Sequence, residues 1–500
     1  MTPKPQNTIL NTVQFILTLL LALPASQDGP PVSFALLAAP QGVSPSQGTG
    51  PSLPPKGLPM WGPDTDPLAL PNRPTMPIED WRRWIEEHAA NTQRGLRLRS
   101  AGGGVLVQGT SEAVASLEDF AKEVQQLIED LRIEIKVTVQ AAESDPVVQT
   151  GWLPSGGHLA LGQMQRMGFV GSWRSEIAAD SAVAEPEVWT SQTGWSLHLH
   201  ASRQVTGAGI LMAGSFQLNA QTGATSFDPE TPDLGLMKQP QIAHTRLDFA
   251  GLLAPGKTLQ LQTTRDGQLL NVTIEAQVNG ELSKPGGWAV LETANLWPDL
   301  PWIETTDQGS PWPPSSLAAI LAGSGGGGSA LWAGSLLLIP PGAEALESQA
   351  RQLIQALSTL GQNHILSAQL GPDSCRIPGV EGLPMGLRMG QVTSAMTGYR
   401  TEMATDAWIA EPQVQILFHG TSLEGNPATP AGRFSWEQKG LTKRDRIAPS
   451  DLAYLGSLES LTEQRRSGTL LLEPDNPKVK VTASDSHQEI ALQLLGNDQR

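Results

Sequence analysis

Two stretches of this 500-residue chain repeat each other almost residue for residue. Residues 173–188 read WRSEIAADSAVAEPEV, and residues 399–414, 226 positions later, read YRTEMATDAWIAEPQV. The identical pairs are Arg174/Arg400, Glu176/Glu402, Ala178/Ala404, Asp180/Asp406, Ala184/Ala410, Glu185/Glu411, Pro186/Pro412 and Val188/Val414. Eight identities in sixteen positions, without a gap, indicate a tandem duplication, so two related units are expected.

The segment before each stretch carries a helical pattern. Apolar residues at helical spacing predict one helix after Thr110 and a second over residues 343–360. Leu127-Ile128 in the first helix and Leu353-Ile354 in the second are again 226 positions apart. The duplication therefore includes the helices as well as the repeated stretch.

The remaining periodicity is that of strands. Residues 96–110, LRLRSAGGGVLVQGT, predict a hairpin before the first helix, and alternating apolar residues predict a strand over 133–140. From about 142 to 290, short alternating runs separated by Gly, Pro, Asn and Asp indicate antiparallel strands. The predicted fold class is α+β, with two tandem units that each consist of a small α+β domain (hairpin, helix, strand) followed by an antiparallel β-rich segment.

Composition shifts set the expected boundaries. The expected organisation is a signal peptide (1–25), a Pro/Gly-rich disordered linker (26–75), a first α+β unit (76–141) with its β-rich segment (142–290), a Pro/Trp-rich linker (291–315), and a second α+β unit (316–370) with its β-rich segment (371–496).

The N-terminus predicts export. An apolar run from Val13 to Leu23 follows a single charge at Lys4, and it is shorter than the roughly 20 residues that span a bilayer. Cys375 is the only cysteine, so no internal disulfide forms, as expected in the envelope of a Gram-negative-type bacterium. The net charge of −16 argues against nucleic acid as a partner. A membrane contact is expected only through a partner or through an uncleaved N-terminus.

Several stretches resemble bacterial secretins. The strand–glycine turn–strand at 96–110 and the helix after it resemble a periplasmic N-domain of that family. AEPEVWTSQTGWSLHLHA, with Pro186, Val188, Gly194, Leu197 and Leu199, and QIAHTRLDFAGLLAPGKTLQLQ (241–262) are similar to the β-rich secretin segment. The resemblance covers about 76–280 and 316–496 and implies small α+β units that pack side by side in ring assemblies. Unlike a channel-forming secretin, this chain alternates unit and β-segment twice, so the resemblance leaves pore formation open.

The repeated acids are the candidate residues for chemistry. Paired carboxylates act as acid and base or bind a metal, and Glu176, Asp180, Glu402 and Asp406 are the residues of that kind. Along one extended strand Glu176 and Asp180 lie on one face and Glu185 on the other, so they do not converge. Glu185 and Glu411 precede prolines, which predicts the end of a strand.

The repeat is therefore interpreted as a structural signature. Its polar and proline positions are Arg174, Glu176, Asp180, Glu185, Pro186, Arg400, Glu402, Asp406, Glu411 and Pro412. His198 and His200 have a spacing that can hold a metal, but the second copy offers only His419, which favours packing or surface histidines. No catalytic residue, cofactor or metal is predicted.

Two functions follow. The first is a non-catalytic exported envelope protein that acts through protein–protein contacts as a component of a secretion-type ring or scaffold. Its partners are an envelope or secretion-system protein or further copies of itself, at the periplasm or outer membrane. The alternative is a periplasmic hydrolase or a ligand- or metal-binding β-protein that uses the repeated acids.

Overall fold

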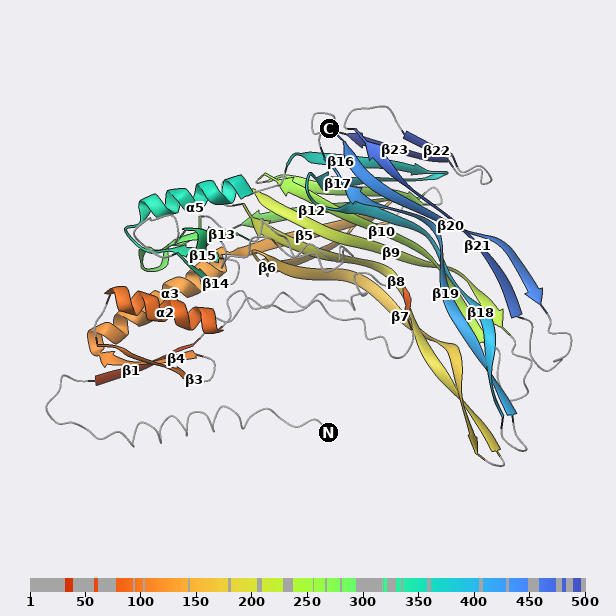
Figure 1. Cartoon of the computed structure of the whole chain (residues 1–500), viewed down its shortest axis with the longest axis horizontal. Coiled ribbons are helices and arrows are strands. Elements are labelled where there is room, and N and C mark those ends of the chain that lie inside the picture. The colour runs from red at the N-terminus through yellow and green to blue at the C-terminus, as the bar shows by residue number, and fades with distance from the viewer. Residues whose placement is uncertain are drawn as a thin grey trace. The chain divides into compact units, whose positions relative to one another are not determined.

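Figure 1 shows the chain as a computed structural model. The structure describes residues 32–38, 58–61, 78–92, 95–101, 104–142, 144–178, 181–204, 209–227, 237–254, 256–265, 268–278, 281–293, 317, 319–321, 330–333, 336–357, 361–403, 408–428, 431–447, 458–473, 479–482 and 489–495. The chain divides into two compact units. Unit 1 comprises residues 1–39 and 82–122, and unit 2 comprises residues 40–81 and 123–500.

Unit 1 is a two-layer structure of helices on one face of a small antiparallel sheet (Figure 1). The sheet order is β1 (Val32–Ala38), β4 (Gly104–Thr110) and β3 (Arg97–Ala101). The helices are α2 (Ile78–Thr92) and α3 (Ser111–Asp130). Residues 82–92 of α2 and residues 111–122 of α3 belong to this unit. The Thr110 hydroxyl accepts a hydrogen bond from the Ala113 N–H at 3.3 Å and so caps α3. Phe120 packs edge-to-face on Trp84 and stacks on His88, which joins the two helices.

Unit 2 contains a nine-stranded antiparallel sheet made of two four-stranded meanders. The first meander is β7 (Gly157–Ala178), β8 (Ser181–Arg203), β9 (Ile210–Phe227) and β10 (Met237–Leu253); the second is β18 (Met385–Met403), β19 (Trp408–Asn426), β20 (Gly432–Ile447) and β21 (Leu458–Leu472). The short strand β2 (Met60–Trp61) pairs with β8. The meanders join where β10 pairs with β18, with Ile242 opposite Val392 and Asp248 opposite Gly386.

A second large sheet in unit 2 has eight strands. Its order is β22 (Val479–Thr482), β23 (Glu489–Leu495), β16 (Asn363–Leu370), β17 (Asp373–Val380), β11 (Thr258–Arg265), β12 (Gln268–Val278), β5 (Arg132–Ala141) and β6 (Val147–Pro154). A three-stranded sheet of β13 (Ala289–Glu292), β15 (Leu336–Ile339) and β14 (Leu331–Ala333) packs with helix α5 (Glu344–Leu357), and a 3-10 turn spans Pro285–Gly287.

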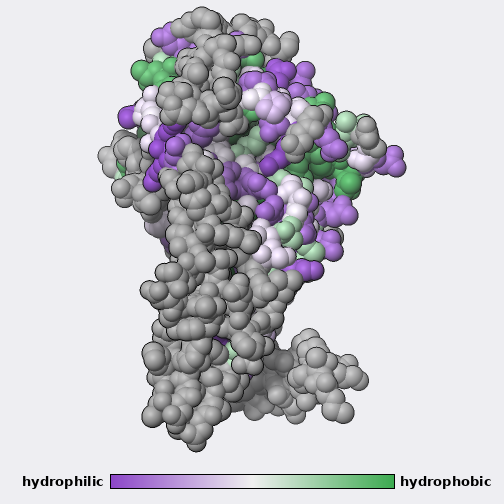
Figure 2. All heavy atoms as spheres, turned by 90° about the vertical axis from the view of Figure 1, so that its right-hand side faces the viewer, coloured by the Kyte–Doolittle hydropathy of each residue, from purple (hydrophilic) through white to green (hydrophobic). Residues whose placement is uncertain are grey.

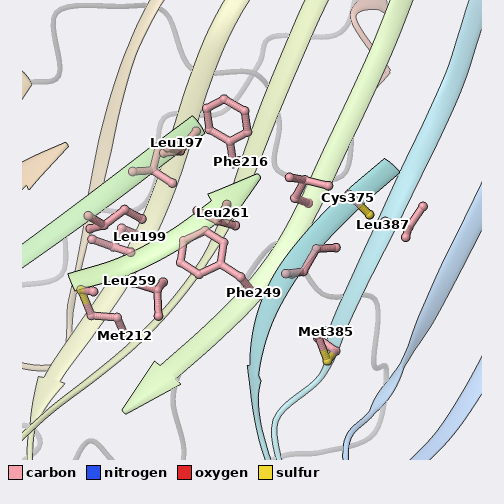
Figure 3. Close-up of a cluster of buried hydrophobic side chains, with 14 of the residues drawn as sticks. Leu197, Leu199, Met212, Phe216, Phe249, Leu259, Leu261, Cys375, Met385 and Leu387 are labelled. Carbon is pink, nitrogen blue, oxygen red and sulfur yellow. The ribbon is translucent and has the colours of Figure 1, made fainter. Parts of the chain in front are cut away.

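The main core lies between the two large sheets. Alternate residues of the strands that line it point into it, as the period of two in a β-strand requires. Leu197 and Phe216 of the nine-stranded sheet and Leu261 of the eight-stranded sheet are fully buried there. Figure 3 shows these side chains with Phe249 and Cys375 in one cluster. Since strands from both halves of the chain line this core, it stabilises them together.

The predicted fold class is wrong. Strands predominate, in several large antiparallel sheets, and the expected pair of small α+β domains with separate β-rich segments is not formed. The strand after each helix, β5 or β16, does not complete a small domain with the hairpin before that helix. Both join the eight-stranded sheet, where β11 pairs with β17. The physical reason is that an alternating strand is satisfied by any partner that completes its ladder and covers its apolar face.

Some expectations fall wholly or partly outside the described residues. The signal peptide at 1–25 lies outside them, and so does most of the linker at 26–75, although β1 and β2 are strands within that range. Of the linker at 291–315, only residues 291–293 are described. Within the described part of the chain, no helix is long and apolar enough to cross a membrane.

Candidate functional site

The repeated stretches form the ends of two matching β-hairpins. In the β7–β8 hairpin Arg174 lies opposite Glu185, and in the β18–β19 hairpin Arg400 lies opposite Glu411. Each hairpin has one register shift, between Val170 and Ser172 in the first and between Met396 and Gly398 in the second, which is again an offset of 226. The sequence repeat therefore corresponds to a repeated backbone register.

The hairpin changes where the acids lie. A turn separates Glu176 from Glu185, and opposite residues of an antiparallel pair share a face. Glu176 lies opposite Val183, two positions from the Arg174–Glu185 pair, so the register puts positions 174, 176 and 185 on one face. The expectation that 176 and 185 lie on different faces is wrong because it treated the stretch as one strand.

The acids are not gathered into a metal site within the described residues. Glu402 lies opposite Ile409, and each hairpin sets an arginine opposite a glutamate, at Arg400–Glu411 in the second copy. Asp180 and Asp406 lie outside the described residues. Across the part of the chain that is described, no group of three or more His, Cys, Asp or Glu side chains has a geometry for a metal ion.

The end of the first hairpin packs on neighbouring strands. Val170 and Trp173 of β7, together with Val414 of β19, pack against Met237 of β10. The Gln239 amide donates a hydrogen bond to the Gly171 carbonyl, at 3.4 Å, where the register shift frees that group. The first residues of the signature thus act as packing elements.

The His198-x-His200 pair lies on a polar face of the nine-stranded sheet. Both rings project from the face of β8 opposite the main core, and His158 lies across from His200 with ring centroids 5.3 Å apart. His198 is fully buried, and neither of its ring nitrogens has a hydrogen-bond partner among the described residues. Burial, with smaller effects of Arg246 and His158, lowers the His198 pKa to about 4.

A second histidine on this face is also held neutral. His244 Nδ1 is 2.8 Å from Asn219 Oδ1, and burial, followed by Arg388, Arg246 and Arg265, lowers the His244 pKa to about 3. Arg246 pairs with Asp248 at 3.0 Å on the same strand. His419 lies on β19, where Nε2 is 3.1 Å from the Thr393 hydroxyl.

Cys375 does not supply a nucleophile. It is buried between the two large sheets, and burial raises the pKa of its thiol to about 12. A thiol held in that state carries almost no thiolate at neutral pH, and the thiolate is the reactive form. The side chain behaves as a small apolar core residue.

Two surfaces were missed by the sequence patterns. One is the outer face of the unit 1 sheet, where Phe34 and Leu36 are 36% and 49% exposed. They belong to β1, which lies inside the segment expected as a linker, and only the short run VSFALLA signals a strand there. The other is the outer face of the eight-stranded sheet, whose polar residues come from six strands of both chain halves. Figure 2 shows hydrophilic and hydrophobic residues interspersed over the described part of one side of the molecule.

No protein-family model matches this chain, and no curated protein matches it. Among solved structures, the secretin-domain β-barrel of InvG from the Salmonella SPI-1 injectisome is 11% identical over 59% of this chain and 94% of that chain, with a TM-score of 0.25. The Salmonella SPI-1 basal-body model of InvG, PrgH and PrgK is 11% identical over 63% of this chain and 70% of that chain, with a TM-score of 0.24. Another structure of the Salmonella SPI-1 type III secretion secretin InvG is 12% identical over 49% of this chain and 84% of that chain, with a TM-score of 0.21. The chain is remotely similar to secretins, and TM-scores this low do not establish a shared fold.

Proposed function

We propose that this protein is a non-catalytic exported scaffold of the bacterial envelope that assembles head to tail with further copies of itself, as a component of a secretion-type ring. The observation that carries the proposal is the contrast between the two outer faces of unit 1. A face on one copy that complements a different face on the next gives a heterologous contact, which closes into a ring when its rotation closes.

The sheet face of unit 1 is apolar and basic. Its cross-strand rows run Phe34–Gln108–Arg97 and Leu36–Leu106–Arg99 across β1, β4 and β3. Arg97 and Arg99 are exposed, and Leu106 is half-buried between them and β1. The described rows carry two cations and no acid. An exposed apolar patch rimmed by charge is typical of a protein-binding surface.

The helix face of the same unit is acidic. Glu112, Glu118 and Asp119 are exposed on α3, and Lys122, the one base of α3 within unit 1, lies 2.8 Å from Asp119. On the part of α2 in this unit, Arg82 and Arg83 are matched by Glu86 and Glu87. The three acids leave this face with a net charge opposite to that of the sheet face. Complementary charge favours encounter in one orientation and disfavours like faces.

Export rests on the sequence. The apolar run from Val13 to Leu23 supports export through the inner membrane. The single cysteine is compatible with the oxidising periplasm, because a chain with one cysteine has no internal disulfide to form.

Charge reversal tests the assembly. The chain is purified from the envelope of a Gram-negative expression host, and its mass is measured by light scattering on a sizing column. The native chain is expected as an oligomer, and the doubly substituted Arg97→Glu/Arg99→Glu variant and the Glu118→Arg/Asp119→Arg variant are each expected as smaller species. Mixing the two variants restores the oligomer, because each then offers the charge that the other lacks.

The control is Lys238→Glu, at an exposed position of β10 in unit 2, which should leave the oligomer unchanged. A monomeric native chain, or two variants that keep the native mass, contradicts the head-to-tail contact.

A further inference from the structure

We propose that the outer face of the eight-stranded sheet binds a neutral glycan chain. This face is opposite the main core, because inward residues such as Ile133, Ile135 and Val137 of β5 are buried and the residues between them face solvent. The site is independent of the assembly contact on unit 1, since all its residues belong to unit 2.

A groove of about 410 Å³ crosses strands β12, β5 and β6 on this face. Two cross-strand rows line it: Glu275–Lys136–Thr150 and Gln277–Glu134–Trp152. Arg132 closes one end, with its guanidinium carbon 4.7 Å from the centre of the Trp152 ring. The groove thus places one aromatic ring among polar and charged side chains, so a ligand there can bond the polar groups while the ring covers an apolar part of it.

The charges of this groove are already paired with each other. Lys136 Nζ is 2.9 Å from Glu275 Oε1, and Arg132 Nη2 is 3.8 Å from Glu134 Oε1. Two cations and two carboxylates leave no net charge for an ionic ligand to balance. They still offer both donors and acceptors, and a hydroxyl group both donates and accepts. A polyol therefore matches this first groove better than an anion or a cation does.

A second groove, of about 340 Å³, lies farther along the same face. It is lined by residues of β11, β17 and β16 and the loop before β11: Lys257, Thr258, Leu259, Gln260, Gln262, Ile365, Arg376 and Pro378. Its two cations, Lys257 and Arg376, have no acid beside them in this lining and offer donors to hydroxyl oxygens. Gln260 pairs across to Thr273, which pairs across to Thr138, so neutral polar side chains continue from this groove toward the first.

One row of polar residues crosses six of the eight strands of this face. It runs Gln140–Asn271–Gln262–Arg376–Ser367–Gln493 over strands β5, β12, β11, β17, β16 and β23. At the usual strand separation of about 4.8 Å, these six strands span about 24 Å. That length suits a chain of several sugars lying across the strands, with amides bonding its hydroxyl groups and Trp152 covering an apolar sugar face.

The test uses the full chain and a defined probe, the neutral hexasaccharide of β-1,4-linked N-acetylglucosamine, by isothermal titration calorimetry. Saturable binding is expected for the native chain. The Trp152→Ala and Gln262→Ala variants, one in each groove, are expected to weaken binding at least tenfold each. Gln125→Ala, an exposed glutamine of α3 outside the face, should bind as the native chain does.

Circular dichroism of each variant checks the fold, and Trp152→Phe provides a milder change that keeps an aromatic ring. Binding to cellohexaose instead of the acetylated probe supports the proposal and identifies the sugar. Absence of binding to both oligosaccharides overturns it, and so does binding that both groove variants leave unchanged. Binding of extended peptides in place of either sugar also overturns it.

Discussion

Acidification is expected to destabilise the fold through His198. A histidine whose pKa is lower in the folded than in the unfolded chain resists protonation only while it is folded. As the pH falls below about 6.5, the unfolded chain takes up a proton that folded His198 refuses until about pH 4. The unfolded state is therefore favoured progressively across this window, and the effect vanishes above it.

The size of the effect follows from the shift. One pKa unit corresponds to about 1.36 kcal/mol, and the His198 pKa moves from 6.5 to about 4. Between pH 7 and pH 4.5 the native chain should lose about 2.5 kcal/mol more stability than a His198→Gln variant, which cannot titrate there. For His244, whose pKa is about 3, the loss continues to lower pH.

The measurement is urea unfolding followed by tryptophan fluorescence, at half-unit pH steps from 7 to 4.5, on the native chain and His198→Gln. The quantity compared is the difference in unfolding free energy between the two proteins, which cancels the titration of their common carboxylates. A difference that stays flat over this range, or that moves in favour of the native chain as the pH falls, refutes a buried neutral His198.

Three further predictions concern packing and backbone. Phe216→Ala leaves a cavity at a fully buried position between the large sheets and should lower the free energy of unfolding by about 3–5 kcal/mol, measured as a shift in the midpoint of urea unfolding. Gly194→Ala and Gly420→Ala should each lower the free energy of unfolding by about 1–3 kcal/mol, because φ is +107° at Gly194 and +155° at Gly420 and a Cβ at either position would meet the backbone of the facing strand. A lower midpoint of thermal unfolding reports this loss. Gln149→Ala removes the amide that both donates to and accepts from the Gly162 backbone and should cost about 1–2 kcal/mol, with faster hydrogen exchange at the Gly162 amide.

Local periodicity was enough to predict several elements. The alternation of Ile133, Ile135 and Val137 predicted a strand over 133–140, which β5 (Arg132–Ala141) confirms. The helix after Thr110 is confirmed as α3, and the helix predicted over 343–360 is confirmed as α5 (Glu344–Leu357). These patterns involve residues that are close together in the sequence, so a single sequence is enough to detect them.

Strand partners were not predictable in the same way. An alternating strand such as β5 fits many apolar faces, and nothing in its own residues specifies β12 over the β3–β4 hairpin. The fold class was wrong for this reason. The Glu185-Pro186 step was predicted to end a strand, yet both residues lie within β8. Among the described strands, β8 pairs at Pro186 only with β7, so the missing N–H of proline breaks no ladder on the other side.

The candidate site was only partly accessible from the sequence. Repetition identified Arg174 and Glu185 as a structural pair without revealing the hairpin that sets them opposite each other. The glycan-binding face joins Gln140 to Gln493, and no local pattern connects residues so far apart.

The joint between the two meanders also has a kinetic consequence. Within the first meander, Met237 meets Phe227 only ten positions away, whereas at the joint Asp248 meets Gly386 across 138 positions. Closing the longer loop costs about 2.3 kcal/mol more in chain entropy than closing the shorter one. We therefore expect each meander to form before β10 and β18 meet. Until they do, two bare strand edges face the solvent, and that interval is when the chain is most vulnerable to aggregation.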